Sequence, residues 1–96
     1  MAAGDYQLIQ VAEITDRPGM LRMKLARLEG GATDREVEVA LPRDAFEKGL
    51  LDIGAVVAVR EKAYGLELAN GQTQQTFFLV LTDEWFRELG VKPVVL

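Results

Sequence analysis

Hydrophobic and polar residues alternate along much of this chain with a period of two, which is typical of half-buried β-strands. The clearest alternation covers residues 35–41, where valine or leucine takes every second position and glutamate or alanine lies between. Residues 20–28 repeat the pattern, with Leu21, Met23 and Leu25 on one face. We therefore expect two matched strands that bury one apolar face together.

The polar faces of these two segments carry opposite charges. Arg22 and Lys24 lie on one segment, and Glu36 and Glu38 lie on the other. In an antiparallel pair they would be opposite or diagonal to one another, and such pairs contribute about 0.2–1 kcal/mol each. We expect the charges to help fix the register of the pair across the loop at 30–34.

Turn residues predict where further strands meet. A strand over residues 6–15 ends in Asp16-Arg17-Pro18-Gly19, a turn sequence that begins a first hairpin. The Asn70-Gly71 dipeptide lies between residues 66–69 and 72–81, and it predicts a tight hairpin with a type I′ turn.

A short helix is predicted over residues 42–49. Pro42 suits the first helical position, and Gly49 suits the left-handed residue just past the helix end. We expect Phe46 and Leu50 to be its buried anchors. The valine-rich run at 55–60 follows as the centre of the sheet.

Together these elements predict one domain over residues 1–96. Its expected class is mainly β: a small antiparallel β-barrel or a strongly bent sheet, SH3-like or OB-like, with five to six strands and two short helices. The apolar residues change parity between Val59 and Tyr64, so we also expect a bulge or break near Gly65. The run from Leu41 to Val59 resembles the swapped-hairpin barrels of the AbrB type, although we carry no functional residue over from that family.

The composition removes most catalytic chemistry. The 96 residues contain no histidine, no cysteine and no serine, so serine and cysteine nucleophiles and zinc sites built on His or Cys are excluded. The aspartates at 16, 34, 44 and 52 fall in turns or caps rather than in a calcium-loop spacing. We predict no catalytic residue, no metal site and no cofactor, and hence no enzyme.

Charge and hydropathy bear on partners and location. No apolar run approaches the ~20 residues of a membrane span, and the start of the chain does not resemble a signal peptide, so we expect a cytoplasmic protein without membrane contact. A net charge of −4 and a pI near 4.8 disfavour nucleic acid. The alternative function is a nucleic-acid-binding small barrel that uses Arg22, Lys24 and Arg27, with Tyr6 as a stacking platform.

Apolar residues near the end of the chain give the leading functional hypothesis. A second helix capped by Thr82 or Asp83 would end at Gly90, followed by an apolar tail. We expect a non-catalytic interaction or assembly module that binds a protein partner or a second copy of itself. The candidate interface comprises Trp85, Phe86, Leu89, Val94, Val95 and Leu96. In the other interpretation, these side chains plug an open end of the barrel.

Overall fold

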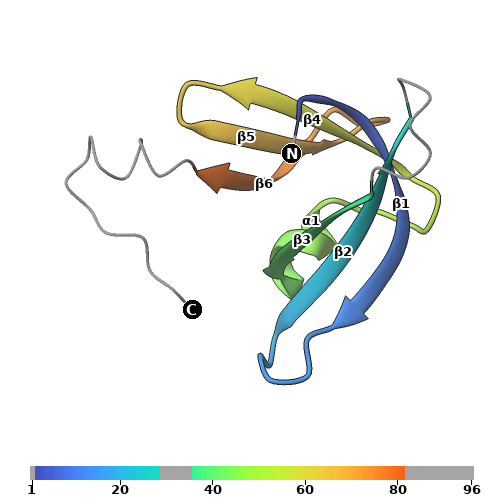
Figure 1. Ribbon diagram of the computed structural model, residues 1–96, viewed down its shortest axis with the longest axis vertical. Helices are drawn as coiled ribbons and strands as arrows, with labels where there is room; N and C mark the ends of the chain where they lie inside the picture. The colour runs from blue at the N-terminus through green and yellow to red at the C-terminus, as the bar shows by residue number, and fades with distance from the viewer. Residues whose placement is uncertain (1, 29–35, 82–96) are drawn as a thin grey trace.

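In a computed structural model, which describes residues 2–28 and 36–81, the chain forms one antiparallel sheet of six strands in the order β3-β2-β1-β4-β5-β6 (Figure 1). The elements are β1 (Gly4–Glu13), β2 (Met20–Arg27), β3 (Glu36–Pro42), α1 (Arg43–Lys48), β4 (Val56–Lys62), β5 (Gly65–Asn70) and β6 (Thr76–Leu81). The predicted mainly β class is therefore confirmed. Within the described residues, no helix is long and apolar enough to cross a membrane.

The pairing of β2 with β3 follows the predicted register. Lys24 lies directly opposite Glu38, and the apolar partners Met23 and Val39 face each other on the buried side. The ion pairs are diagonal: Arg22 lies 3.6 Å from Glu38, and Lys24 lies 3.8 Å from Glu36. Period-two patterning therefore determined both the faces and the register, because a one-residue slip would move every apolar side chain into solvent.

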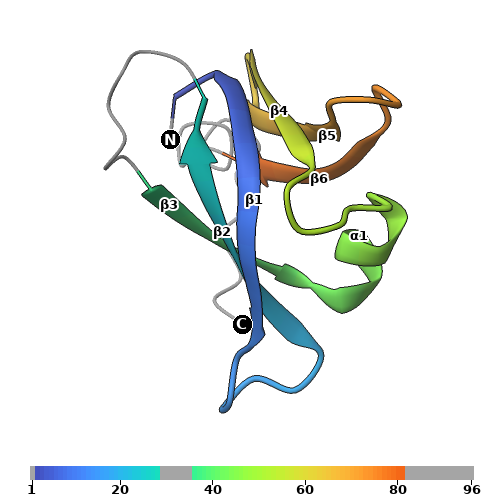
Figure 2. The ribbon, with the colours of Figure 1, turned by 90° about the vertical axis from the view of Figure 1, so that its right-hand side faces the viewer.

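Core side chains come from all six strands and form one cluster. The middle strands β1 and β4 lie side by side, and Val57, Ala58 and Val59 are buried, as expected for the centre of the sheet. The cluster comprises Tyr6, Leu8, Leu21, Met23, Leu25, Val39, Leu41, Leu51, Val57, Val59, Leu68 and Phe77. Side chains of the β1–β3 half and the β4–β6 half thus share one interior, with α1 beside it (Figure 2).

The sheet is open, and the closed barrel of the sequence prediction is not observed. In the described residues β3 and β6 are its two edges, and no pairing joins them. Neither closure nor strong curling is present, although the first hairpin is as predicted, with Gly19 at φ +81°. Alternation specifies which side chains face the core, but it contains no information on whether the two edge strands meet.

The connection between β5 and β6 differs from the predicted type I′ turn. The loop spans five residues, 71–75, and the non-glycine residue with positive φ is Gln74 at +66°. Gly71 continues toward β4, where its amide donates to the Val56 carbonyl at 2.8 Å. The Asn-Gly pair therefore ends a strand here instead of forming the turn. The predicted break near Gly65 is confirmed as the two-residue turn between β4 and β5, because Lys62 pairs with Gly65.

The helix α1 ends differently from the prediction. Gly49 keeps right-handed backbone angles, with φ −72°, and Leu50 takes the left-handed conformation at φ +52°. The glycine at 49 leaves room for the Phe77 ring, since a Cβ there would lie 3.0 Å from that ring. Because of this left-handed conformation, the Leu50 side chain is exposed to solvent and Leu51 is buried in the core. The prediction of Leu50 as a buried anchor is therefore wrong.

Candidate functional site

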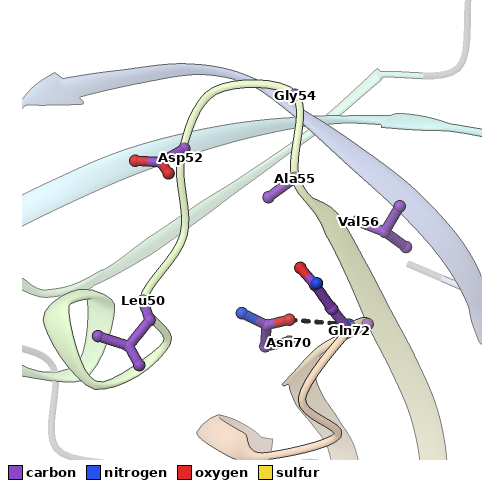
Figure 3. A pocket seen from close by; sticks show the side chains of 8 residues that line it. Leu50, Asp52, Gly54, Ala55, Val56, Asn70 and Gln72 are labelled. Atoms are coloured by element: carbon purple, nitrogen blue, oxygen red, sulfur yellow. Dashed lines mark hydrogen bonds between the residues drawn. The ribbon is translucent and has the colours of Figure 1, made fainter.

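A pocket of about 480 Å³ opens between the loop that precedes β4 and the loop that follows β5 (Figure 3). Leu50 and Val56 lie on opposite sides of it, and Asp52 is its one charged lining residue. The complete lining is Leu50, Asp52, Gly54, Ala55, Val56, Asn70, Gly71 and Gln72. This volume lies within the range typical of ligand-binding pockets, about 300–1,000 Å³.

Asn70 joins the two loops that form the pocket. Its side chain is only 6% exposed, and its Nδ2 donates to the Gly49 carbonyl at 2.8 Å. Its Oδ1 accepts from the amides of Gln72 at 2.8 Å and Thr73 at 3.1 Å. One buried side chain therefore holds the end of α1 and the start of the 71–75 loop in a fixed relation.

The loop before β4 is also fixed to β1. The amide of Gly54 donates to the Leu8 carbonyl at 2.7 Å, and the amide of Leu8 donates to the Ala55 carbonyl at 2.9 Å. Gly54 has φ +95°. The loop that forms this side of the pocket is consequently held by several backbone hydrogen bonds.

Two aliphatic side chains that line this pocket, and one between the lining residues Asp52 and Gly54, are exposed to solvent. Leu50 is 74% exposed and Ile53 is 65% exposed, and Val56 is the third, less exposed member. We call Leu50, Ile53 and Val56 the apolar rim. A leucine in the left-handed region costs about 1–2 kcal/mol relative to ordinary backbone angles, and an unfavourable conformation that displays an apolar side chain is more typical of a contact site than of a structural position.

The basic residues of the alternative hypothesis already have partners. Arg22 and Lys24 form ion pairs with Glu38 and Glu36, and the Arg27 guanidinium donates to the Ala3 carbonyl at 3.3 Å. Tyr6 is 2% exposed and belongs to the core, so it cannot stack on a base. A polyanion contact by these residues therefore has less support than it had from the sequence.

The six residues of the predicted protein interface, Trp85, Phe86, Leu89, Val94, Val95 and Leu96, lie outside the described residues. The apolar rim and Asn70 were not identified as a site from the sequence. A signal was present in the Asp52-Ile53-Gly54 turn, where isoleucine occupies a position that usually exposes its side chain. Among residues 2–28 and 36–81, no cluster of three or more metal-ligating side chains occurs.

A second polar group lies on β5 around Glu67. Thr76 and Tyr64 donate hydrogen bonds to its carboxylate, and Arg60 lies 3.9 Å away. These hydrogen bonds, first that of Thr76 and then that of Tyr64, hold the pKa of Glu67 below its usual value, and the charges of Lys62 and Arg60 act in the same direction. Burial, followed by the bond to Glu67, raises the pKa of Tyr64.

This arrangement predicts an acid-dependent loss of stability. Because the pKa of Glu67 is lower in the folded state than in the unfolded state, its contribution is present above the ordinary glutamate pKa, about 4.3, and disappears as pH falls through the folded value. We expect wild type to exceed Glu67→Gln in free energy of unfolding near neutral pH, and the difference to close below about pH 4. Urea unfolding of both proteins across pH measures it; a difference independent of pH would contradict the assignment.

Comparison of the chain with protein-family models, with curated proteins and with solved structures finds no match.

Proposed function

We propose that the protein is a non-catalytic interaction module and that the apolar rim with its pocket is its contact surface. The observation that carries the proposal is Leu50, an exposed leucine held at φ +52° on the edge of a pre-formed pocket. Exposed aliphatic groups beside a concave site favour a protein partner, because a side chain of the partner can fill the pocket while the rim packs around it.

A second copy of the chain is the partner that best fits this geometry. The surface holds both a projection, at Leu50 and Ile53, and a pocket next to it. Under a two-fold axis, the projection of each copy can enter the pocket of the other, which is the self-complementarity that an isologous dimer requires. We therefore expect a homodimer in which the rims of the two copies are in contact.

The substitution Leu50→Asn tests this proposal. Asparagine tolerates left-handed backbone angles better than leucine, so the variant should unfold with a free energy about 0.5–1 kcal/mol above that of wild type. The same change removes the apolar projection and should convert the dimer to a monomer. Urea unfolding at a concentration where wild type is also monomeric measures the first effect, because dimerisation would itself raise the apparent stability of wild type. Light scattering over a dilution series measures the second.

The matched control is Leu28→Asn, which removes another exposed leucine that does not line the pocket. This variant should keep the wild-type mass. A wild type that is monomeric at every concentration would exclude the dimer, and a dimer that persists in Leu50→Asn would place the contact elsewhere.

A further inference from the structure

Charged side chains without an ion pair lie beside the apolar rim. They belong to residues 44–56, which include most of α1 and the loop before β4, and all of them are exposed: Asp44, Glu47, Lys48 and Asp52. Within the described residues none of the four takes part in an ion pair, although Asp44 lies one helical turn before Lys48. In this part of the chain the four charges can therefore face a partner.

The signs of these charges restrict how two copies can meet. Three of the four are negative, and Lys48 is the one cation in the sequence from 44 to 56. An isologous interface makes every contact twice, because a residue that touches a second residue across the axis is itself matched by the reverse contact. Such a surface attracts its own copy only if the lysine of each chain lies opposite an acid of the other.

Asp52 is the acid best placed to receive the lysine. It lines the pocket, which Asp44 and Glu47 do not, and it lies on the same side of the pocket as Leu50 (Figure 3). Lys48 and Asp52 are each two residues from Leu50, and two residues span at most about 7 Å. When Leu50 of one copy enters the pocket of the other, Lys48 of the first copy is therefore brought close to Asp52 of the second.

The chemistry of lysine suits this position. Its four-carbon stem can lie along apolar surface such as Leu50 and Val56, while the ammonium group stays at the edge of the contact. We propose that Lys48 of each copy forms an ion pair with Asp52 of the other, and that these two pairs set the orientation of the dimer. The inference rests on the homodimer proposed above. Apolar contacts have no preferred direction, whereas paired charges fix the register.

Exchanging the two charges tests the pair. Lys48→Glu and Asp52→Lys each bring like charges together twice in the dimer, so each should raise the Kd of the dimer about tenfold or more. The double variant Lys48→Glu/Asp52→Lys restores both pairs with the signs reversed, and its Kd should return to within about threefold of wild type. Light scattering over a dilution series at low salt measures all four proteins, because salt screens exposed charges.

Two controls separate the pair from a general effect of net charge. Lys62→Glu makes the same change in charge at the far end of β4, and Asp16→Lys does so in the turn after β1. Both residues are exposed, and neither lines the pocket. Both control variants should keep the Kd of wild type.

The outcomes distinguish the ion pair from the dimer itself. Single reversals that leave the Kd unchanged, while Leu50→Asn is monomeric, would overturn the ion pair and leave the dimer surface in place. A double variant as weak as the single variants would also overturn it. So would single reversals that destabilise the monomer to urea and are corrected in the double variant, because the pair would then lie within one chain. A wild type that is monomeric at every concentration would exclude the homodimer, and the ion pair with it.

Discussion

Gly65→Ala is expected to lower the free energy of unfolding by about 3 kcal/mol or more. A Cβ on residue 65 would lie 2.0 Å from the Val80 carbonyl oxygen and 2.9 Å from the Leu81 Cα. Both are backbone atoms of the paired strand β6, so neither can rotate away. The glycine also has φ +147°, a conformation that residues with a side chain rarely adopt. Urea unfolding followed by circular dichroism measures the loss, against a total stability of about 5–15 kcal/mol for a domain of this size.

Gly19→Ala is the control for this prediction. Gly19 has φ +81°, but a Cβ there would meet no atom within 4 Å. Gly19→Ala should therefore lower the free energy of unfolding through backbone strain alone, by about 1–2 kcal/mol. If Gly65→Ala cost no more than Gly19→Ala, the close approach of β5 and β6 at this position would be wrong.

The strands were predictable where one residue type repeats at a fixed spacing. The alternation at 20–28 and 35–41 determined β2, β3, their register and their diagonal ion pairs, because each of these depends only on which face a side chain occupies. The central position of β4 was predictable for a similar reason, since consecutive valines require burial on both faces.

Turns and closure were less predictable because tertiary contacts decide them. Asn70-Gly71 has the local preference for a two-residue turn, but the Asn70 side chain is used to hold Gly49, and a Cβ on Gly71 would lie 2.7 Å from Val56. Gly49 likewise leaves room for the Phe77 ring, and the left-handed conformation is found at Leu50 instead. In each case a glycine that sequence rules assign to backbone freedom serves close packing.

The apolar rim was missed for a related reason. Leu50 and Leu51 are adjacent and identical in type, and helical periodicity favours the burial of Leu50. The left-handed backbone conformation of Leu50, at φ +52°, reverses the chain direction there, so that Leu51 is buried and Leu50 is exposed. The position of the candidate site therefore follows from how a six-residue helix ends, and helix ends are the least predictable part of an element.

Asn70→Ala is expected to destabilise the protein by about 2–4 kcal/mol. The substitution removes three hydrogen bonds, each worth about 1 kcal/mol, and one of them is the bond to the carbonyl of buried Gly49. Because Asn70 connects the end of α1 to the 71–75 loop, its loss should also release the two walls of the pocket from each other. We expect hydrogen exchange to accelerate at the amides of Gln72 and Thr73, which lose their acceptor.

Gln72→Ala is the control. It tests whether the loss of stability is specific to the hydrogen bonds of Asn70 or follows from any truncation in the 71–75 loop. Gln72 lines the same pocket, but its side chain is exposed, so its truncation should change the free energy of unfolding by less than about 0.5 kcal/mol. An Asn70→Ala protein as stable as Gln72→Ala would mean that the loops hold their positions without the asparagine. If instead Asn70→Ala is the weaker protein and also dissociates to a monomer, the dimer surface depends on the relation between α1 and the 71–75 loop, as expected for a pocket that residues from both sides line.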